Sequence, residues 1–273
     1  MNAAAAGVLG RGLAGLAHDG LRIRRDVVRL QIAASFPEHD PDWVRRITLA
    51  TYRHFGAEIF TLAAGPRSVR AALARVRDPD RVVERLACAR EGSARVIVTG
   101  HIGNWELAGA YLASRIPVTT VAQRQRGVWD RRLMAIRNAA GLEVLHHDER
   151  AGRVARALEA GGCVCLVADQ HASSGSAALP FLGRRAQTRL GPARLALRAN
   201  VPLAFGALIR AGEGYEVVWE PIGEELMATG DAVAVTRAWL GALERAVRRW
   251  PAQYFWFHRR WKTARTTGDM SVT

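Results

Sequence analysis

The sequence predicts an α/β fold with a mostly parallel central sheet flanked by helices, preceded by a helical N-terminal segment. From Arg95 onward, short runs rich in β-branched residues alternate with amphipathic stretches of about helix length. This alternation is typical of a parallel sheet covered on both faces, because each crossover between parallel strands usually contains a helix. Before Arg95, apolar residues recur at helical spacing instead. At 273 residues the chain is long enough for one large domain.

The N-terminal part is expected to be helical. Asp40 and Pro41 form a typical N-cap and first turn, and apolar residues follow at helical spacing until Gly65 and Pro66. These apolar positions are Trp43, Ile47, Phe55, Ile59 and Leu62. We therefore expect a helical segment at residues 1–65, a candidate for membrane association, and an α/β domain at residues 66–273, packed as one unit.

The first residues are rich in Ala, Gly and Leu but do not predict export or a spanning helix. They lack a basic start, contain Arg11, and fall short of the roughly 20 apolar residues that cross a bilayer. Two interpretations stay open in equal measure, a shallow interfacial helix and a surface helix packed on the domain. Both rest on the apolar residues Val8, Leu9, Leu13, Leu16, Leu21, Val28 and Ile32, set among Arg11, Arg22, Arg24, Arg25 and Arg29.

The second part alternates strands and helices. We expect strands at Val96–Thr99, Val118–Val121, Val144–Leu145, Val164–Val167, Leu203–Ile209 and Tyr215–Trp219, and helices at Leu190–Ala199 and Ala232–Arg249. A Gly/Ser-rich loop is expected at Ser173–Ala178. The alternating run from Tyr254 to Lys262 favours a terminal strand that buries Phe255 and Phe257.

The charge balance points to an anionic partner. Lys and Arg number 39 against 25 Asp and Glu, a net charge of +14, although a single lysine, Lys262, indicates that coding bias explains much of the arginine excess. Nucleic acid, anionic lipid, a phosphorylated substrate and an acidic carrier protein are the candidates. The three cysteines, Cys88, Cys163 and Cys165, are expected to be reduced core residues.

Polar residues that follow the strands carry the chemistry expected of such a sheet. His101 and Glu106 follow the strand Val96–Thr99, and they can meet only if the turn at Gly103 and Asn104 folds His101 back. His101 would then remove a proton from a substrate hydroxyl, and Glu106 would fix the imidazole tautomer. Free backbone N–H groups beside the N-cap Asn104 would stabilise an oxyanion, and Gly103 and Asn104 are expected to contact the substrate. The alternative is structural, with Asn104 as N-cap and Glu106 complementing the helix dipole.

The string from Gly100 to Glu106, Gly-His-Ile-Gly-Asn-Trp-Glu, resembles the late acyltransferases of lipid A biosynthesis within the lysophospholipid acyltransferase superfamily. The resemblance covers roughly residues 40 to 263. It extends to Gln123-Arg124-Gln125, Asp169-Gln170, Pro180-Phe181-Leu182-Gly183, Gly191-Pro192 and the run Tyr254–Lys262.

The resemblance implies a glycerol-3-phosphate acyltransferase-like fold and an acyltransferase at the cytoplasmic face of the inner membrane, peripherally attached. Acyl carrier protein would donate the acyl chain to a lipid A precursor, with His101 and Glu106 as catalytic dyad and no cofactor. Arg124 would bind a substrate phosphate, and Asp169 with Gln170 would support the site. Arg259 and Arg260 are candidates for contact with lipid phosphate or an acidic carrier.

Other interpretations stay open. Acylation of a phosphatidylinositol mannoside or another glycolipid from acyl-CoA is the nearest alternative, and Glu106 favours the lipid A branch over it. A basic lipid- or nucleic-acid-binding protein without activity is the alternative from another class, although we expect no nucleic-acid partner. His146-His147-Asp148, with Asp169 and His171, contains metal-ligand residue types, but the irregular spacing predicts no metal site. No G-x-S-x-G, P-loop or G-x-G-x-x-G motif is present.

Overall fold

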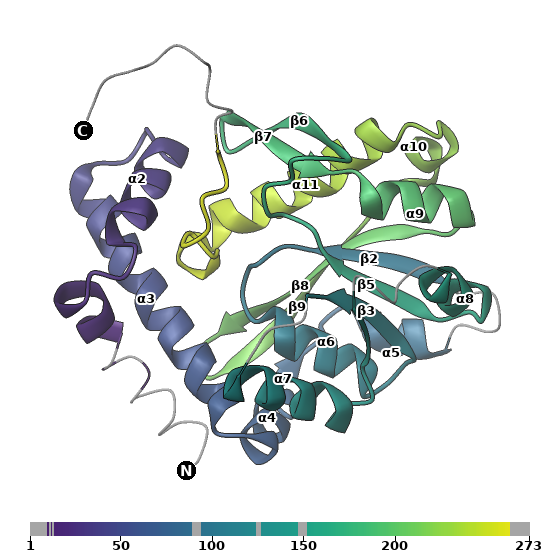
Figure 1. Cartoon of the computed structure of the whole chain (residues 1–273), viewed down its shortest axis with the longest axis horizontal. Helices are drawn as coiled ribbons and strands as arrows, with labels where there is room; N and C mark the ends of the chain where they lie inside the picture. Colours follow the sequence, from purple (N-terminus) through teal and green to yellow (C-terminus); the bar gives the residue numbers. More distant parts are fainter. Residues whose placement is uncertain are drawn as a thin grey trace.

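A computed structural model describes residues 10, 12, 14–88, 94–123, 127–146 and 152–262. Its centre is a seven-stranded sheet with the order β1-β9-β8-β2-β5-β3-β4 (Figure 1). All neighbouring strands run parallel except the antiparallel pair β8 and β9, which confirms the predicted fold class. The strands are β1 (Val76–Arg77), β2 (Arg95–Thr99), β3 (Val118–Ala122), β4 (Glu143–His146), β5 (Cys163–Val167), β8 (Leu203–Ala211) and β9 (Gly214–Pro221).

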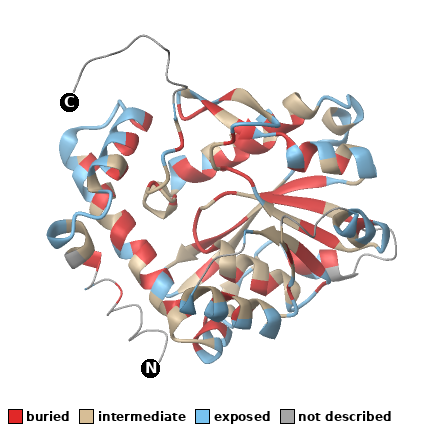
Figure 2. Ribbon diagram, in the orientation of Figure 1, coloured by how far each residue is buried: buried red, intermediate tan, exposed pale blue. Residues whose placement is uncertain are grey.

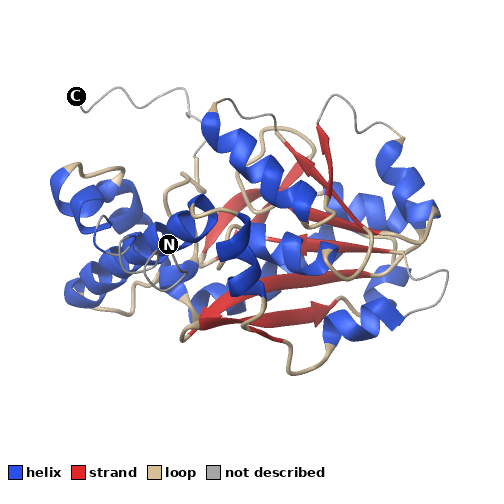
Figure 3. Ribbon diagram, turned by 90° about the horizontal axis from the view of Figure 1, so that it is seen from below, coloured by secondary structure: helices blue, strands red, loops and turns tan. Residues whose placement is uncertain are grey.

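Helices cover both faces of this sheet, as Figure 3 shows from the side. One face carries α4 (Pro66–Leu73), α5 (Val82–Cys88), α6 (Trp105–Ala113) and α7 (Val128–Ala139). The other carries α8 (Arg153–Glu159), α9 (Gly191–Ala199) and α11 (Ala232–Arg249), with α10 (Glu224–Ala228) beside α11. Successive β2 residues alternate between the two faces: Val96 and Val98 pack in the core under α9 and α11, and Ile97 packs with Val82 of α5.

A two-stranded hairpin, β6 (Ser176–Phe181) and β7 (Arg184–Arg189), lies against α11. The sequence predicted only a loop at Ser173–Ala178, and this prediction was wrong from Ser176 onward. The Gly/Ser composition applies to the entry into the hairpin, whereas the pairing depends on the later residues 184–189.

The N-terminal part forms a helical arm at one end of the sheet (Figures 1 and 3). It consists of η1 (Leu16–Gly20), α2 (Arg25–Ser35) and α3 (Pro41–Ala63). The predicted cap is confirmed, since Oδ1 of Asp40 accepts a hydrogen bond from the N–H of Trp43 at 2.6 Å. In the described ranges, no helix combines the length and the apolar character needed to cross a membrane.

Only part of the proposed interfacial stripe is accessible. Val28 and Ile32 are fully buried, so this face of α2 packs on the domain (Figure 2). Around α2, Leu21, Ile23 and Leu30 are exposed, at 68%, 48% and 60%, and Ile59 of α3 is 49% exposed. Val8, Leu9, Arg11 and Leu13 lie outside the described residues.

The segment after α11 is not the expected strand. It begins with the short helix η2 (Pro251–Gln253) and then makes a single bridge between Tyr254 and Ile102. Tyr254 and Trp256 are the buried residues, not Phe255 and Phe257, so the predicted face was wrong. The backbone of this segment forms hydrogen bonds with side chains and loops and not with a neighbouring strand. Its side chains therefore do not alternate between a buried and an exposed face as in a regular strand. Gln31 of α2, for example, donates to the carbonyls of Trp256 and His258.

Candidate active site

His101 follows β2, and its ring is paired with a carboxylate from the next strand of the sheet. Its Nδ1 lies 2.6 Å from Oδ1 of Asp169, whose side chain is 2% exposed. The two residues meet because β2 and β5 are parallel neighbours with Thr99 opposite Val167, so both chains leave the sheet at the same edge. Burial alone would raise the pKa of Asp169, but His101 and Arg260 together hold this pKa below its ordinary value.

The other ring nitrogen is open to an incoming group. Nε2 of His101 lies 3.2 Å from Nε2 of Gln170, so a neutral ring that donates from Nδ1 to Asp169 accepts the Gln170 amide N–H at Nε2. This is the tautomer that a general base requires. A substrate hydroxyl can take the place of the amide at the same nitrogen.

Glu106 has a different partner from the expected one. Its carboxylate forms a two-point ion pair with Arg137 of α7, with N–O distances of 2.9 and 2.7 Å. Glu106 lies in the first turn of α6, which faces α7, whereas His101 is held at the strand end by Asp169. The prediction that Glu106 fixes the tautomer of His101 was therefore wrong, because Asp169 occupies that position. A catalytic contribution from Glu106 stays a prediction.

The backbone N–H groups of the expected substrate-binding residues Gly103 and Asn104 are committed to other acceptors. The N–H of Gly103 donates to the carbonyl of Gln253, and that of Asn104 to the carbonyl of Leu208, both at 2.9 Å. Asn104 itself is the N-cap of α6, because its Oδ1 accepts from the N–H of Leu107. The next two N–H groups, those of Trp105 and Glu106, have no acceptor in the described part of the chain and remain available at this helix N-terminus.

A cavity of about 690 Å³ opens beside these groups, between the sheet and the layer of α6 and α7. This volume is within the usual range for small-molecule sites. Polar residues at the strand ends, His101, Gln123 and Gln170, line it together with Glu106 and Arg137. The rest of the wall is mostly apolar and includes Ile59, Leu62, Ile97, Leu112, Leu133, Leu142, Val217 and Trp219.

Comparison with known proteins decides the family. Residues 3–263 match the family described as bacterial lipid A biosynthesis acyltransferase. The chain belongs to this acyltransferase family. A histidine beside a cavity with mostly apolar walls suits the transfer of an acyl chain.

Two relatives of this acyltransferase are both named phosphatidylinositol mannoside acyltransferase. The protein from Mycolicibacterium smegmatis (strain ATCC 700084 / mc(2)155) is 28% identical over 267 residues, which cover 95% of this chain and 86% of the relative. The protein from Mycobacterium tuberculosis (strain ATCC 25618 / H37Rv) is 27% identical over 235 residues, covering 82% of this chain and 72% of the relative. These names match the nearest alternative acceptor considered from the sequence, a phosphatidylinositol mannoside.

The predicted arginine ligands of the acyltransferase differ in their placement. Arg124 lies outside the described residues. Arg259 is exposed. Arg260 is 1% exposed and donates to the carbonyl of Gln187 and the hydroxyl of Thr188, so its predicted contact with a lipid phosphate or a carrier protein was wrong. The packing around Phe181 and Tyr254 encloses its guanidinium.

Sequence reasoning missed two arginines that line the cavity of the acyltransferase. Arg137 comes from the last turn of an ordinary amphipathic helix, and Arg189 ends a hairpin that the sequence did not reveal. Neither position carried a local signal in a chain with so many arginines. Of the candidate metal residues, His147 and Asp148 lie outside the described residues, and elsewhere in the described ranges no group of three ligand side chains converges. Cys163 and Cys165 are free, and burial raises the pKa of both thiols.

Proposed function

We propose that this acyltransferase moves a fatty acyl chain from a thioester to a hydroxyl of a phosphorylated glycolipid of the phosphatidylinositol mannoside type, with His101 as general base. The observation that carries the proposal is the His101 ring itself. Nδ1 is fixed by Asp169 at 2.6 Å, while among the described residues the hydrogen-bond partner of Nε2 is the replaceable amide of Gln170, in a cavity with mostly apolar walls.

The reaction follows from this geometry. The acceptor hydroxyl displaces the Gln170 amide at Nε2 of His101 and gives up its proton as its oxygen attacks the thioester carbonyl. Asp169 stabilises the imidazolium that forms. The carbonyl oxygen then carries a negative charge, which the free N–H groups of Trp105 and Glu106 at the N-terminus of α6 would stabilise. Collapse of the intermediate breaks the C–S bond, and the thiolate takes the proton back from His101.

The identity of the acceptor rests on the relatives and on charge. Both named relatives act on a phosphatidylinositol mannoside by their names, and such a lipid carries a phosphate. Arg189 lines the cavity and has no ion-pair partner among the described residues, so it is a candidate for the phosphate contact. A lipid A precursor is the second candidate, because the family as a whole bears that name.

We also propose that the protein works at the inner, cytoplasmic face of the plasma membrane, where glycolipid acceptors are embedded. Three apolar side chains project from the N-terminal arm, Leu21, Ile23 and Leu30. Arg22 and Arg29 are exposed beside them. Apolar side chains among arginines suit a shallow, peripheral contact with an anionic lipid surface.

A panel of purified substrates tests the proposal. The protein is incubated with palmitoyl-CoA or palmitoyl acyl carrier protein, together with a phosphatidylinositol mannoside or a lipid A precursor, and products are identified by mass spectrometry. We expect acylated mannoside from at least one donor and none from His101→Ala. Acylation of the lipid A precursor alone would replace the acceptor, and an active His101→Ala variant would remove the assigned base.

A further inference from the structure

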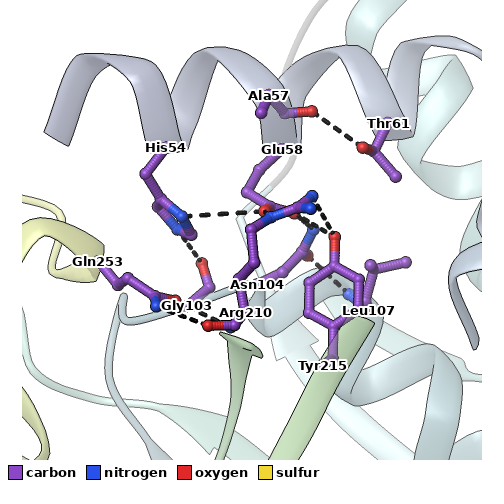
Figure 4. A network of polar contacts seen from close by, with 10 residues as sticks. All are labelled: His54, Ala57, Glu58, Thr61, Gly103, Asn104, Leu107, Arg210, Tyr215 and Gln253. Carbon is purple, nitrogen blue, oxygen red and sulfur yellow. Dashed lines mark hydrogen bonds and ion pairs between the residues drawn. The ribbon is translucent and has the colours of Figure 1, made fainter. Parts of the chain in front are cut away.

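A second group of polar side chains is buried between α3 and the loop that carries His101 (Figure 4). Its centre is Glu58, which is 4% exposed. The Glu58 carboxylate accepts three hydrogen bonds, from Nδ2 of Asn104 at 2.6 Å, from the hydroxyl of Tyr215 at 2.7 Å and from Nε of Arg210 at 2.5 Å. A carboxylate removed from water in this way is tolerated only when it is paired and hydrogen-bonded.

Glu58 determines which way the Asn104 amide faces. An ionised carboxylate only accepts hydrogen bonds, so it requires the NH₂ side of the amide. Burial would raise the pKa of Glu58, but His54 and Arg210 outweigh burial and keep the pKa below its ordinary value. The amide oxygen of Asn104 is thereby left to accept from the N–H of Leu107 and to cap α6.

A second contact ties the same loop to α3. Nε2 of His54 lies 3.2 Å from the carbonyl of Gly103, and burial lowers the pKa of His54. Gly103 has φ +60°, and a Cβ there would lie 2.0 Å from the carbonyl oxygen of Leu208. At Gly103 the loop is therefore packed so tightly between α3 and β8 that no side chain fits.

The first turn of α6 is what this network positions. Trp105 and Glu106 follow the capping residue directly, and both residues line the same cavity as His101. The Trp105 ring meets the His101 ring edge to face, with centroids 4.8 Å apart. A rotation of the Asn104 amide would release the cap and move both N–H groups relative to the base.

We infer that Glu58 is a positioning residue for acyl transfer: anchored by Arg210 and Tyr215, it fixes the Asn104 cap and so the first turn of α6 relative to His101. The inference rests on the proposed role of His101 as base. Glu58 belongs to α3, so the helical segment is an integral part of the active site.

An exchange of the carboxylate and the amide tests this inference. In Glu58→Gln the new amide faces the Asn104 amide, and in Asn104→Asp two carboxylates oppose each other. The double variant Glu58→Gln, Asn104→Asp restores one carboxylate against one amide, and an aspartate still caps the helix. We expect each single variant to lose about 30-fold or more in kcat at nearly constant KM, and the double variant to recover most of it.

Two features of the experiment separate positioning from simple stability. The kcat values refer to the folded fraction, determined by circular dichroism, and Glu84→Gln serves as a control at an exposed ion pair. Asn104→Asp should also lose kcat progressively as pH rises, because its two carboxylates can share a proton only at lower pH. Losses that merely follow the unfolded fraction, or a double variant as inactive as the singles, would overturn the inference.

A further measurement needs no substrate. The N–H of Leu107 is bonded to the Asn104 cap, so its hydrogen exchange reports whether the cap is formed. We expect exchange at Leu107 to accelerate at least about tenfold in Glu58→Gln and to return in the double variant. Unchanged exchange in Glu58→Gln would refute the positioning, whatever the acceptor lipid proves to be. A wild-type protein inactive on the mannoside but with this exchange pattern would refute only the proposed acceptor.

Discussion

Oδ1 of Asp169 lies 2.6 Å from Nδ1 of His101, although 68 positions separate the two residues in the chain. The contact exists because β2 and β5 are parallel neighbours. The carboxylate bonded to His101 thus follows the adjacent strand, and the carboxylate of Glu106, closer in the sequence, pairs with Arg137.

Replacing Asp169 with asparagine should nearly abolish turnover. The amide would donate to Nδ1 and leave the proton on Nε2, which is the wrong tautomer for a base; the analogous change in a serine protease costs about 10⁴-fold in kcat, and we expect about 10³- to 10⁴-fold here. Steady-state kinetics with a thermal unfolding control measure this. A variant that keeps more than a tenth of the wild-type kcat would show that Asp169 does not orient His101.

The pair of Glu106 and Arg137 should show coupled effects on stability. The side chains are 13% and 12% exposed, so removing either charge leaves the other poorly solvated. Breaking a fully buried pair costs about 3–5 kcal/mol, and partial exposure should reduce this to about 2 kcal/mol. We expect Glu106→Gln and Arg137→Met each to lower the free energy of unfolding, and the double variant to lose less than the sum. Strict additivity in urea unfolding would contradict the coupling.

Local sequence signals were sufficient for most strands of the central sheet and for the position of His101 past a strand end, but not for the partners of His101 or for β1. Runs such as Val96–Thr99 have strong period and composition, and His101 follows directly from the rule that chemistry lies past strand ends. The pairing of His101 with Asp169 depends on which strands become neighbours, and no local sequence pattern predicts the strand order β2-β5-β3. The buried carboxylate of Glu58 could not be predicted either, because charged residues on one face of a helix usually indicate a solvated face.

Arg189 should contribute to acceptor affinity more than to turnover. It lines the cavity and has no ion-pair partner among the described residues, so its guanidinium is available to bind a substrate phosphate. Arg189→Met is expected to raise the KM for the phosphorylated acceptor by about 10-fold, the cost of one charge-assisted hydrogen bond, with kcat nearly unchanged. Arg198→Met, at an exposed position of α9, is the matched control. Equal KM values in the two variants would move the phosphate site elsewhere.

Gly109 should limit the length of the acyl chain that fits. It lines the cavity from α6, and a Cβ at this position would lie 3.3 Å from Cδ2 of Leu142 on the same wall. Gly109→Leu fills part of the apolar space, so we expect the preferred acyl donor to become shorter by several carbons, read from product masses. Gly241→Leu, in α11 and away from this cavity, provides the control for a helical glycine. An unchanged donor preference would place the acyl chain outside this cavity.

His54 should make stability depend on pH in the mildly acidic range. Burial lowers its pKa from the ordinary 6.5, so the unfolded chain takes up the proton first as pH falls. The stabilisation from the neutral ring is complete above about pH 6.5 and is lost as pH falls from there towards the folded-state pKa. His54→Gln retains a donor for the carbonyl of Gly103 but cannot titrate, and its unfolding free energy should fall less steeply between pH 7 and 5. His171 and His258, whose pKa values burial also lowers, contribute to the slope that remains. Parallel urea-unfolding curves for wild type and His54→Gln across this range would rule out His54 as the titrating group.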